Sequence, residues 1–146
     1  MHSAPGSPPR RRFTAFALLG YAASYASRAA AQASGTLRGF MDRAFEMKRR
    51  AEAEGDQPYG AVVVKDGQII AESPSRVVTA RNADAHAERE AMRLAKIALG
   101  GGDLAGCILV SSSRPCGLCE RAAVEHKVSR MFYGAAIIDA GPPRAF

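Results

Sequence analysis

The sequence has few cysteines, no long apolar run and no acidic residue before Asp42. Its three cysteines are an odd number, which does not indicate the disulfide framework of a small secreted domain. The apolar stretch over residues 15–27 has only 13 residues, whereas a helix that spans a bilayer needs roughly 20. The sequence therefore argues against a disulfide scaffold, and we expect no stable membrane span.

The positive charge of the chain is concentrated near its beginning. The whole chain has 20 Lys and Arg against 14 Asp and Glu, a formal net charge of +6. Arg10, Arg11, Arg12 and Arg28 supply four of the positive charges, so residues from Ser34 onward carry only +2. A domain with this balance lacks the basic surplus typical of nucleic-acid binding, and we do not expect a nucleic acid as its partner.

The first 33 residues have the order of features found in a targeting segment. Three arginines and Phe13 precede the apolar stretch, and Ala31-Gln32-Ala33 matches the small-x-small pattern of a cleavage site. The segment resembles a twin-arginine export signal, which implies a periplasmic or secreted protein with a mature domain over residues 34–146. Two alternatives remain: a mitochondrial transit peptide, or a helix that stays on a cytoplasmic protein.

Hydrophobic periodicity and turn residues divide the rest of the chain into alternating elements. We expect a helix over residues 36–54, a β-hairpin over 59–64 and 68–71, a helix over 85–99 capped by Asp84, a strand over 107–110, a helix over 115–126 and a strand over 130–133, followed by a short tail. The hairpin predicts antiparallel pairing, and the later strands predict parallel pairing. The expected fold is therefore a three-layer α/β/α arrangement around a mixed sheet.

Residues able to bind a metal stand at the beginnings of two predicted helices. His86 and Glu88 begin one helix, and Cys116 and Cys119 begin the next. Two thiolates and one imidazole give Zn²⁺ three protein ligands and leave a fourth position for water, as in catalytic zinc sites. Helix N-termini also favour thiolates. Each residue has another interpretation: the cysteines as a redox pair, His86 as a capping or core residue, and Glu88 as a solvated side chain.

The pattern H-x-E followed by P-C-x-x-C resembles the cytidine deaminase-like superfamily of zinc deaminases. The resemblance implies that His86, Cys116 and Cys119 bind Zn²⁺ and that Glu88 transfers protons during hydrolytic deamination of a nucleobase, nucleoside or related small heterocycle. It also implies a homodimer. The chain is shorter than these relatives after its fourth strand.

The runs at residues 58–62 and 85–88 are most similar to the branch of guanine deaminases and tRNA adenosine deaminases. That similarity implies that Ala61 lines the base pocket, that the Ala87 N–H donates to the base, and that Ser75, or its neighbour Arg76, stands where relatives use an asparagine to contact substrate. Ordinary strand packing is the alternative for Ala61.

Two other functions stay open: a deaminase that edits nucleic acid, and a zinc-binding module without activity. The second is suggested by the short C-terminus, by Ser75, and by Arg114 where relatives have Glu. Cys107 lies in an apolar strand and is expected in the core. His126 ends a helix, where a cation suits the helix dipole, so we expect a structural role.

Overall fold

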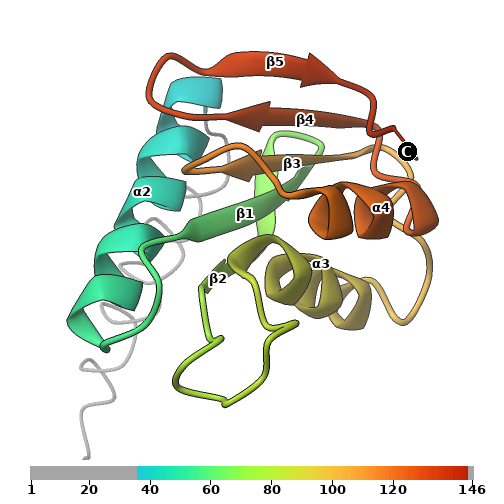
Figure 1. Cartoon of the computed structure of the whole chain (residues 1–146). Coiled ribbons are helices and arrows are strands. Elements are labelled where there is room, and N and C mark those ends of the chain that lie inside the picture. Colours follow the sequence, from blue (N-terminus) through green and yellow to red (C-terminus); the bar gives the residue numbers. More distant parts are fainter. Residues whose placement is uncertain (1–35, 145–146) are drawn as a thin grey trace, which may run out of the picture. The chain divides into compact units, whose positions relative to one another are not determined.

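The sheet has five strands in the order β2-β1-β3-β4-β5, in a computed structural model that describes residues 36–144 (Figure 1). The elements in chain order are α2 (Leu37–Ala53), β1 (Gly60–Lys65), β2 (Gln68–Pro74), α3 (Ala87–Ala98), β3 (Cys107–Ser111), α4 (Gly117–Glu125), β4 (Arg130–Tyr133) and β5 (Ile138–Gly141). The predicted export signal and the predicted domain boundary at residue 34 lie outside the described residues. Within residues 36–144, no helix is both long and apolar enough to cross a membrane.

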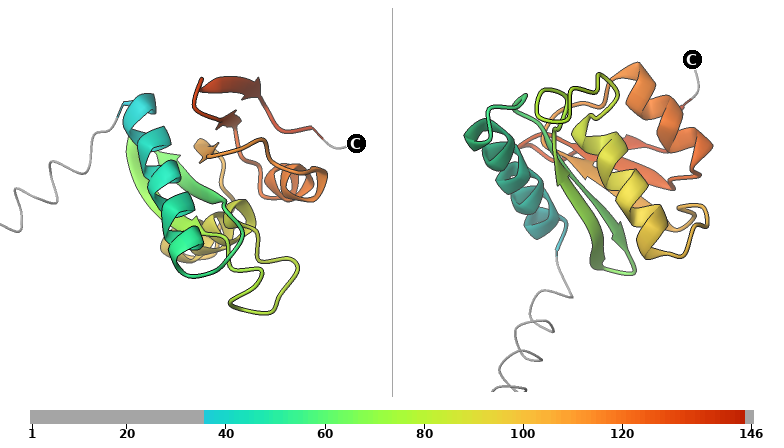
Figure 2. Two further views of the ribbon diagram at one scale, coloured as in Figure 1. Left: turned by 60° about the vertical axis from the view of Figure 1, so that its left-hand side comes forward. Right: turned by 90° about the horizontal axis from the view of Figure 1, so that it is seen from below.

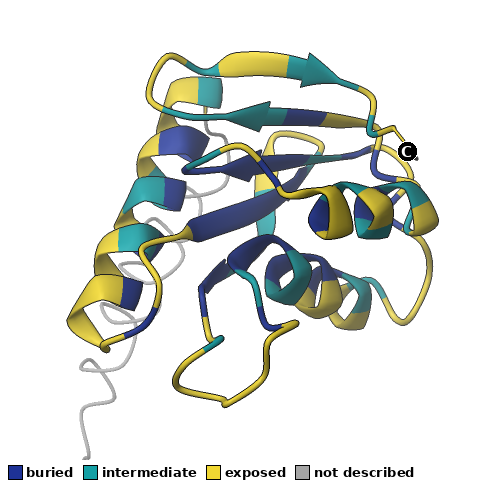
Figure 3. Cartoon of the chain, viewed as in Figure 1, coloured by how far each residue is buried: buried dark blue, intermediate teal, exposed yellow. Residues whose placement is uncertain are grey.

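Helices cover both faces of the sheet, with α2 on one face and α3 and α4 on the other (Figure 2). Successive residues of a strand point to opposite faces, so Val62 and Val64 pack with Phe40 on the α2 side. Ala61 and Val63 pack against the α3 side. Figure 3 shows the buried residues concentrated in the central strands. The predicted three-layer α/β/α fold is confirmed.

Strand pairing agrees with the prediction for the first four strands. β1 and β2 form the antiparallel hairpin, and β3 pairs with β4 in parallel. The sheet is joined in the middle by antiparallel pairing of β1 with β3. In this arrangement the first residues of β1 lie beside the last residues of β2, β3 and β4. The helices α3 and α4 begin at this same end of the strands.

The prediction of a short tail after Gly134 is wrong, because the chain turns there and adds β5 to the sheet edge, antiparallel to β4. The guanidinium of Arg130 donates to the carboxylate of Asp139 at 2.7–3.0 Å across this pair. β5 has only four residues and buries none of them fully. It therefore lacks the hydrophobic alternation by which a strand is recognised in a sequence.

Both helices that carry candidate ligands begin two residues later than predicted. The prediction that Asp84 caps α3 is wrong: His86 occupies the N-cap position, and the carboxylate of Asp84 accepts a hydrogen bond from Arg89 at 2.6 Å instead. Likewise, α4 begins at Gly117 with Cys116 as its N-cap. The shift places one candidate ligand at the N-cap of each helix.

Gly60 fixes the contact between α2 and the start of β1. A Cβ atom at this position would lie 2.2 Å from the carbonyl oxygen of Ala44 and 2.3 Å from the backbone nitrogen of Lys48. Only glycine allows so close an approach of two backbones. Gly60 therefore sets the position of the strand end next to the candidate site.

Two secondary predictions have different outcomes. Cys107 is fully buried in the core, as expected. His126 does cap the end of α4, but burial lowers the pKa of its imidazole and the nearby Lys96 lowers it further. These effects favour the neutral ring, whereas the prediction of a structural role invoked a cation at the helix end; the role itself stays a prediction.

Candidate metal centre

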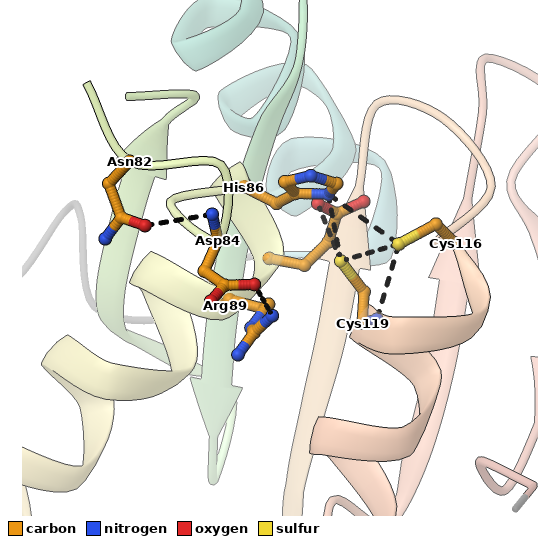
Figure 4. Close-up of polar contacts among 7 residues, drawn as sticks. Asn82, Asp84, His86, Arg89, Cys116 and Cys119 are labelled. Carbon is orange, nitrogen blue, oxygen red and sulfur yellow. Dashed lines mark hydrogen bonds and ion pairs between the residues drawn. The ribbon is translucent and has the colours of Figure 1, made fainter. Parts of the chain in front are cut away.

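His86, Cys116 and Cys119 come together although they lie on two helices separated by a strand. The Nδ1 atom of His86 lies 3.6 Å from the Sγ of Cys116 and 3.4 Å from the Sγ of Cys119, and the two sulfurs are 3.3 Å apart (Figure 4). The three candidate ligand atoms all lie within 4.8 Å of one another. The sequence prediction of one cluster from these two motifs is confirmed in its geometry.

The two helix N-termini hold this cluster. The Sγ of Cys116 accepts a hydrogen bond from the backbone N–H of Cys119 at 3.4 Å, which caps α4. The positive end of each helix dipole lies beside the sulfurs and stabilises negative charge on them. The cap thus places both thiols of α4 toward the histidine that begins α3.

The cluster is closed on one side and open on the other. Cys119 is fully buried, His86 is partly buried and Cys116 is exposed. Burial raises the pKa of the Cys119 thiol, and the neighbouring Glu88 and Cys116 raise it further. A divalent cation is the kind of partner that makes such a thiol ionise, since metal binding displaces its proton.

The donor set fits zinc. One imidazole nitrogen and two sulfurs match the three-ligand set of catalytic zinc sites, in which a fourth position is left for water or substrate. Structural zinc sites have four protein ligands. In the described part of the chain, the third cysteine, Cys107, is not a member of this group and lies in the core.

Glu88 is a buried carboxylate beside the cluster. Its side chain lies in the first turn of α3, only 5% of the residue is exposed, and its Oε2 lies 3.8 Å from the Sγ of Cys119. Burial raises the pKa of this carboxyl, although its own backbone N–H and the nearby His86 act in the opposite direction. The alternative of a solvated helix residue does not describe Glu88. A buried carboxyl at this position can both accept and return a proton during a reaction.

The residues predicted to contact substrate differ in their exposure. Ala61 and Ala87 are fully buried in the core between β1 and α3. Ser75 is also fully buried, and its hydroxyl donates to the Oδ1 of Asp56 at 2.8 Å. Arg76 and Arg114 are exposed on the loops before His86 and Cys116. Direct contact with substrate stays a prediction for all of them.

One buried carboxylate, in the loop after α2, was not found from the sequence. Asp56 is 8% exposed and accepts hydrogen bonds from the loop that leads to His86. Burial alone raises the pKa of a carboxyl, but hydrogen bonds from Thr79, Ser75 and Gln57 outweigh it and hold the pKa of Asp56 well below its usual range. The sequence offered no signal, because Asp56 lies in a turn-forming stretch that ends a helix.

Comparisons with known proteins agree with this geometry. Residues 34–135 match the family model of the cytidine and deoxycytidylate deaminase zinc-binding region. The chain is 45% identical over 83 residues to guanine deaminase of Bacillus subtilis, covering 57% of this chain and 53% of that protein. It is 38% identical over 96 residues to tRNA-specific adenosine deaminase of Agrobacterium fabrum, covering 66% of this chain and 63% of that protein.

Solved structures show the same likeness. The X-ray structure of guanine deaminase from Bacillus subtilis superposes with a TM-score of 0.63 at 40% identity, covering 66% of this chain and 62% of that chain. A structure from a study of tRNA:A34 deaminases gives a TM-score of 0.63 at 36% identity, covering 64% of this chain and 72% of that chain. The chain thus spans less than two thirds of the length of the two curated relatives and of the guanine deaminase structure.

Proposed function

Because the chain belongs to the cytidine and deoxycytidylate deaminase family, we propose that it is a zinc-dependent hydrolytic deaminase of a nucleobase, nucleoside or related small amino-heterocycle. The observation that carries this proposal is the cluster of His86, Cys116 and Cys119, with the buried carboxyl of Glu88 within 3.8 Å of one sulfur. The donor set leaves room for a water molecule, and Glu88 supplies an acid and base at the same place.

The residues divide the work as follows. His86, Cys116 and Cys119 hold zinc, which supplies the Lewis acidity that makes water nucleophilic near neutral pH. The carboxylate of Glu88 takes a proton from the attacking water and gives it to a ring nitrogen of the substrate. The oxygen of the water bonds to the ring carbon that carries the amino group. The same carboxyl then moves the second proton of the former water from the new hydroxyl to the amino nitrogen, the exocyclic C–N bond breaks, and ammonia leaves as the ring carbonyl forms.

A small molecule is favoured over nucleic acid as substrate. The relatives include a guanine deaminase at 45% identity, and residues from Ser34 onward carry a net charge of only +2. Nucleic acid is the second candidate, because tRNA-specific adenosine deaminases are also among the relatives. Phosphate contacts make RNA binding strongly salt-dependent, so tRNA binding that weakens steeply with salt, together with adenosine deamination, would favour the second candidate.

The direct test is ammonia release across a panel of aminopurines and aminopyrimidines, with zinc content measured on the same preparation. We expect turnover of at least one compound and about one zinc per chain. Zinc binding without turnover of any base, nucleoside or tRNA would favour a module that binds zinc without catalysis and would overturn the proposed reaction.

Export and self-association complete the proposal. We propose that residues 1–33 direct the protein to the periplasm or outside the cell and that the mature domain forms a homodimer. Replacing Arg10 and Arg11 by Lys should hold the protein in the cytoplasm of a host with a twin-arginine system. Light scattering of the purified domain should give twice the mass of one chain. Equal export of the parent and the variant would contradict the export signal. A measured mass equal to that of one chain would contradict the homodimer.

A further inference from the structure

Both carboxylate oxygens of Asp56 are fully used by hydrogen bonds from neighbouring loops. Oδ1 accepts from the backbone N–H of Gln57 at 2.8 Å and from the hydroxyl of Ser75 at 2.8 Å. Oδ2 accepts from the backbone N–H of Val78 at 3.0 Å, and from the N–H and hydroxyl of Thr79 at 2.8 and 2.9 Å. Asp56 therefore binds a segment about twenty residues further along the chain through donors alone.

The segment that Asp56 holds is the connection from β2 to α3, which ends at His86. Its base is closed by a hydrogen bond from the backbone N–H of Arg76 to the carbonyl oxygen of Ala85 at 2.9 Å. Residues 78–84 are exposed, and 54% of Val78 is in contact with solvent. Little apolar burial holds this loop, so its attachments to the rest of the domain are polar: the hydrogen bonds to Asp56 in the loop after α2, and the ion pair of Asp84 with Arg89 of α3.

A carboxylate is required at this position. All five groups that contact Asp56 are donors, and three of them are backbone N–H groups that cannot exchange roles. An asparagine has nearly the same shape, but it would direct an NH₂ group at donors whichever way its amide were turned. In the described part of the chain no Lys, Arg or His makes an ion pair with Asp56, so the attachment depends on these hydrogen bonds.

We propose that Asp56 is a positioning residue for substrate binding, which holds the loop of residues 76–84 as one wall of the substrate site. This inference rests on the proposed deaminase function. None of the five hydrogen bonds involves His86, Cys116, Cys119 or Glu88. Loosening the loop should therefore leave the metal and the proton carrier in place and act on substrate affinity.

The test compares Asp56→Asn with Asp66→Asn in the full, zinc-loaded chain. Asp66 is an exposed residue of the hairpin turn between β1 and β2, so its variant controls for the loss of one carboxylate. For Asp56→Asn we expect KM to rise by about tenfold or more, with kcat within about threefold of the parent and about one zinc per chain. An unchanged KM, or a fall in kcat at unchanged KM, would overturn the proposal.

A second pair of variants decides the matter if Asp56→Asn does not fold. Thr79→Val removes one donor to Oδ2, whereas Thr79→Ser keeps both the hydroxyl and the backbone N–H. We expect Thr79→Val to raise KM by about threefold or more and Thr79→Ser to restore the parent value. Equal KM values for the two variants would overturn the role of the carboxylate.

Amide hydrogen exchange separates this inference from the reaction itself. If the parent chain releases no ammonia from any compound, the proposed function fails, but exchange can still be measured. We expect Asp56→Asn to accelerate exchange at Val78 and Thr79 relative to Asp66→Asn, with zinc still bound. Unaltered exchange would show that Asp56 does not hold the loop.

Discussion

The Nδ1 atom of His86 lies 3.4 Å from the Sγ of Cys119, although 33 residues separate them in the chain. The parallel pairing of β3 with β4 and the placement of α3 and α4 on one face of the sheet produce this proximity. Because both helices begin at the same end of the strands, the N-cap residue of α3, His86, lies close to the N-cap residue of α4, Cys116. The fold therefore brings a metal site together from two short motifs.

Removing one sulfur should remove the metal. We expect Cys116→Ala to reduce bound zinc from about one per chain to a small fraction, because two protein ligands seldom retain Zn²⁺. Metal analysis after dialysis measures this directly. The matched control is Cys107→Ala, which changes a buried cysteine outside the cluster and should keep its zinc. Loss of zinc from both variants, or from neither, would contradict the assigned ligands.

Removing the acid should stop turnover without releasing the metal. We expect Glu88→Gln to lower kcat by about 10²–10⁴, the usual contribution of a general acid and base, while zinc content stays at the parent level. Glu90→Gln is the control, because Glu90 lies on the same helix and pairs with Arg93. A Glu88→Gln variant with near-parent turnover would show that another group moves the protons.

Asp56 should make stability depend on pH at the acidic end. Its pKa in the folded state is below the unfolded value of about 3.9, so its stabilisation is present above about pH 4 and is lost as pH falls through the folded pKa. We expect Asp56→Ala to reduce the free energy of unfolding by about 2 kcal/mol at pH 7. The difference from the parent should shrink in urea titrations below about pH 4. If the difference in unfolding free energy between parent and variant did not change with pH, the ionised carboxylate of Asp56 would not be the source of the stabilisation.

A methyl group at Gly60 should disrupt the contact of α2 with β1. We expect Gly60→Ala to lower the free energy of unfolding by about 3 kcal/mol or more, because its Cβ would meet backbone atoms that cannot move separately. Gly102→Ala is the control, since a Cβ there meets nothing within 4 Å. Thermal unfolding of the two variants measures the difference, and equal melting temperatures would contradict the close packing.

The sequence predicted the parts of this fold that depend on local patterns. Hydrophobic periodicity located the three helices and four strands, and the motif at His86 and Cys116 located the metal cluster. β5 was missed because its four residues are exposed or only partly buried, so it has no hydrophobic alternation, and its pairing with β4 is made by backbone groups.

The misplaced helix start and the missed carboxylate have related causes. Asp84 is a good capping residue by type, but its carboxylate accepts from Arg89 and the helix begins after His86. The partners of Asp56 include backbone N–H groups at Val78 and Thr79, and backbone groups carry no signal in a sequence. Contacts of this kind depend on which segments the fold brings together, so local sequence patterns do not predict them.

The central claim is that one imidazole and two sulfurs bind the metal, and X-ray absorption at the zinc K-edge of the zinc-loaded protein tests it most directly. The account predicts two sulfur neighbours at about 2.3 Å and one histidine nitrogen at about 2.0 Å, with a further light atom completing the tetrahedron. A first shell of four sulfurs, or one made only of nitrogen and oxygen, would contradict it.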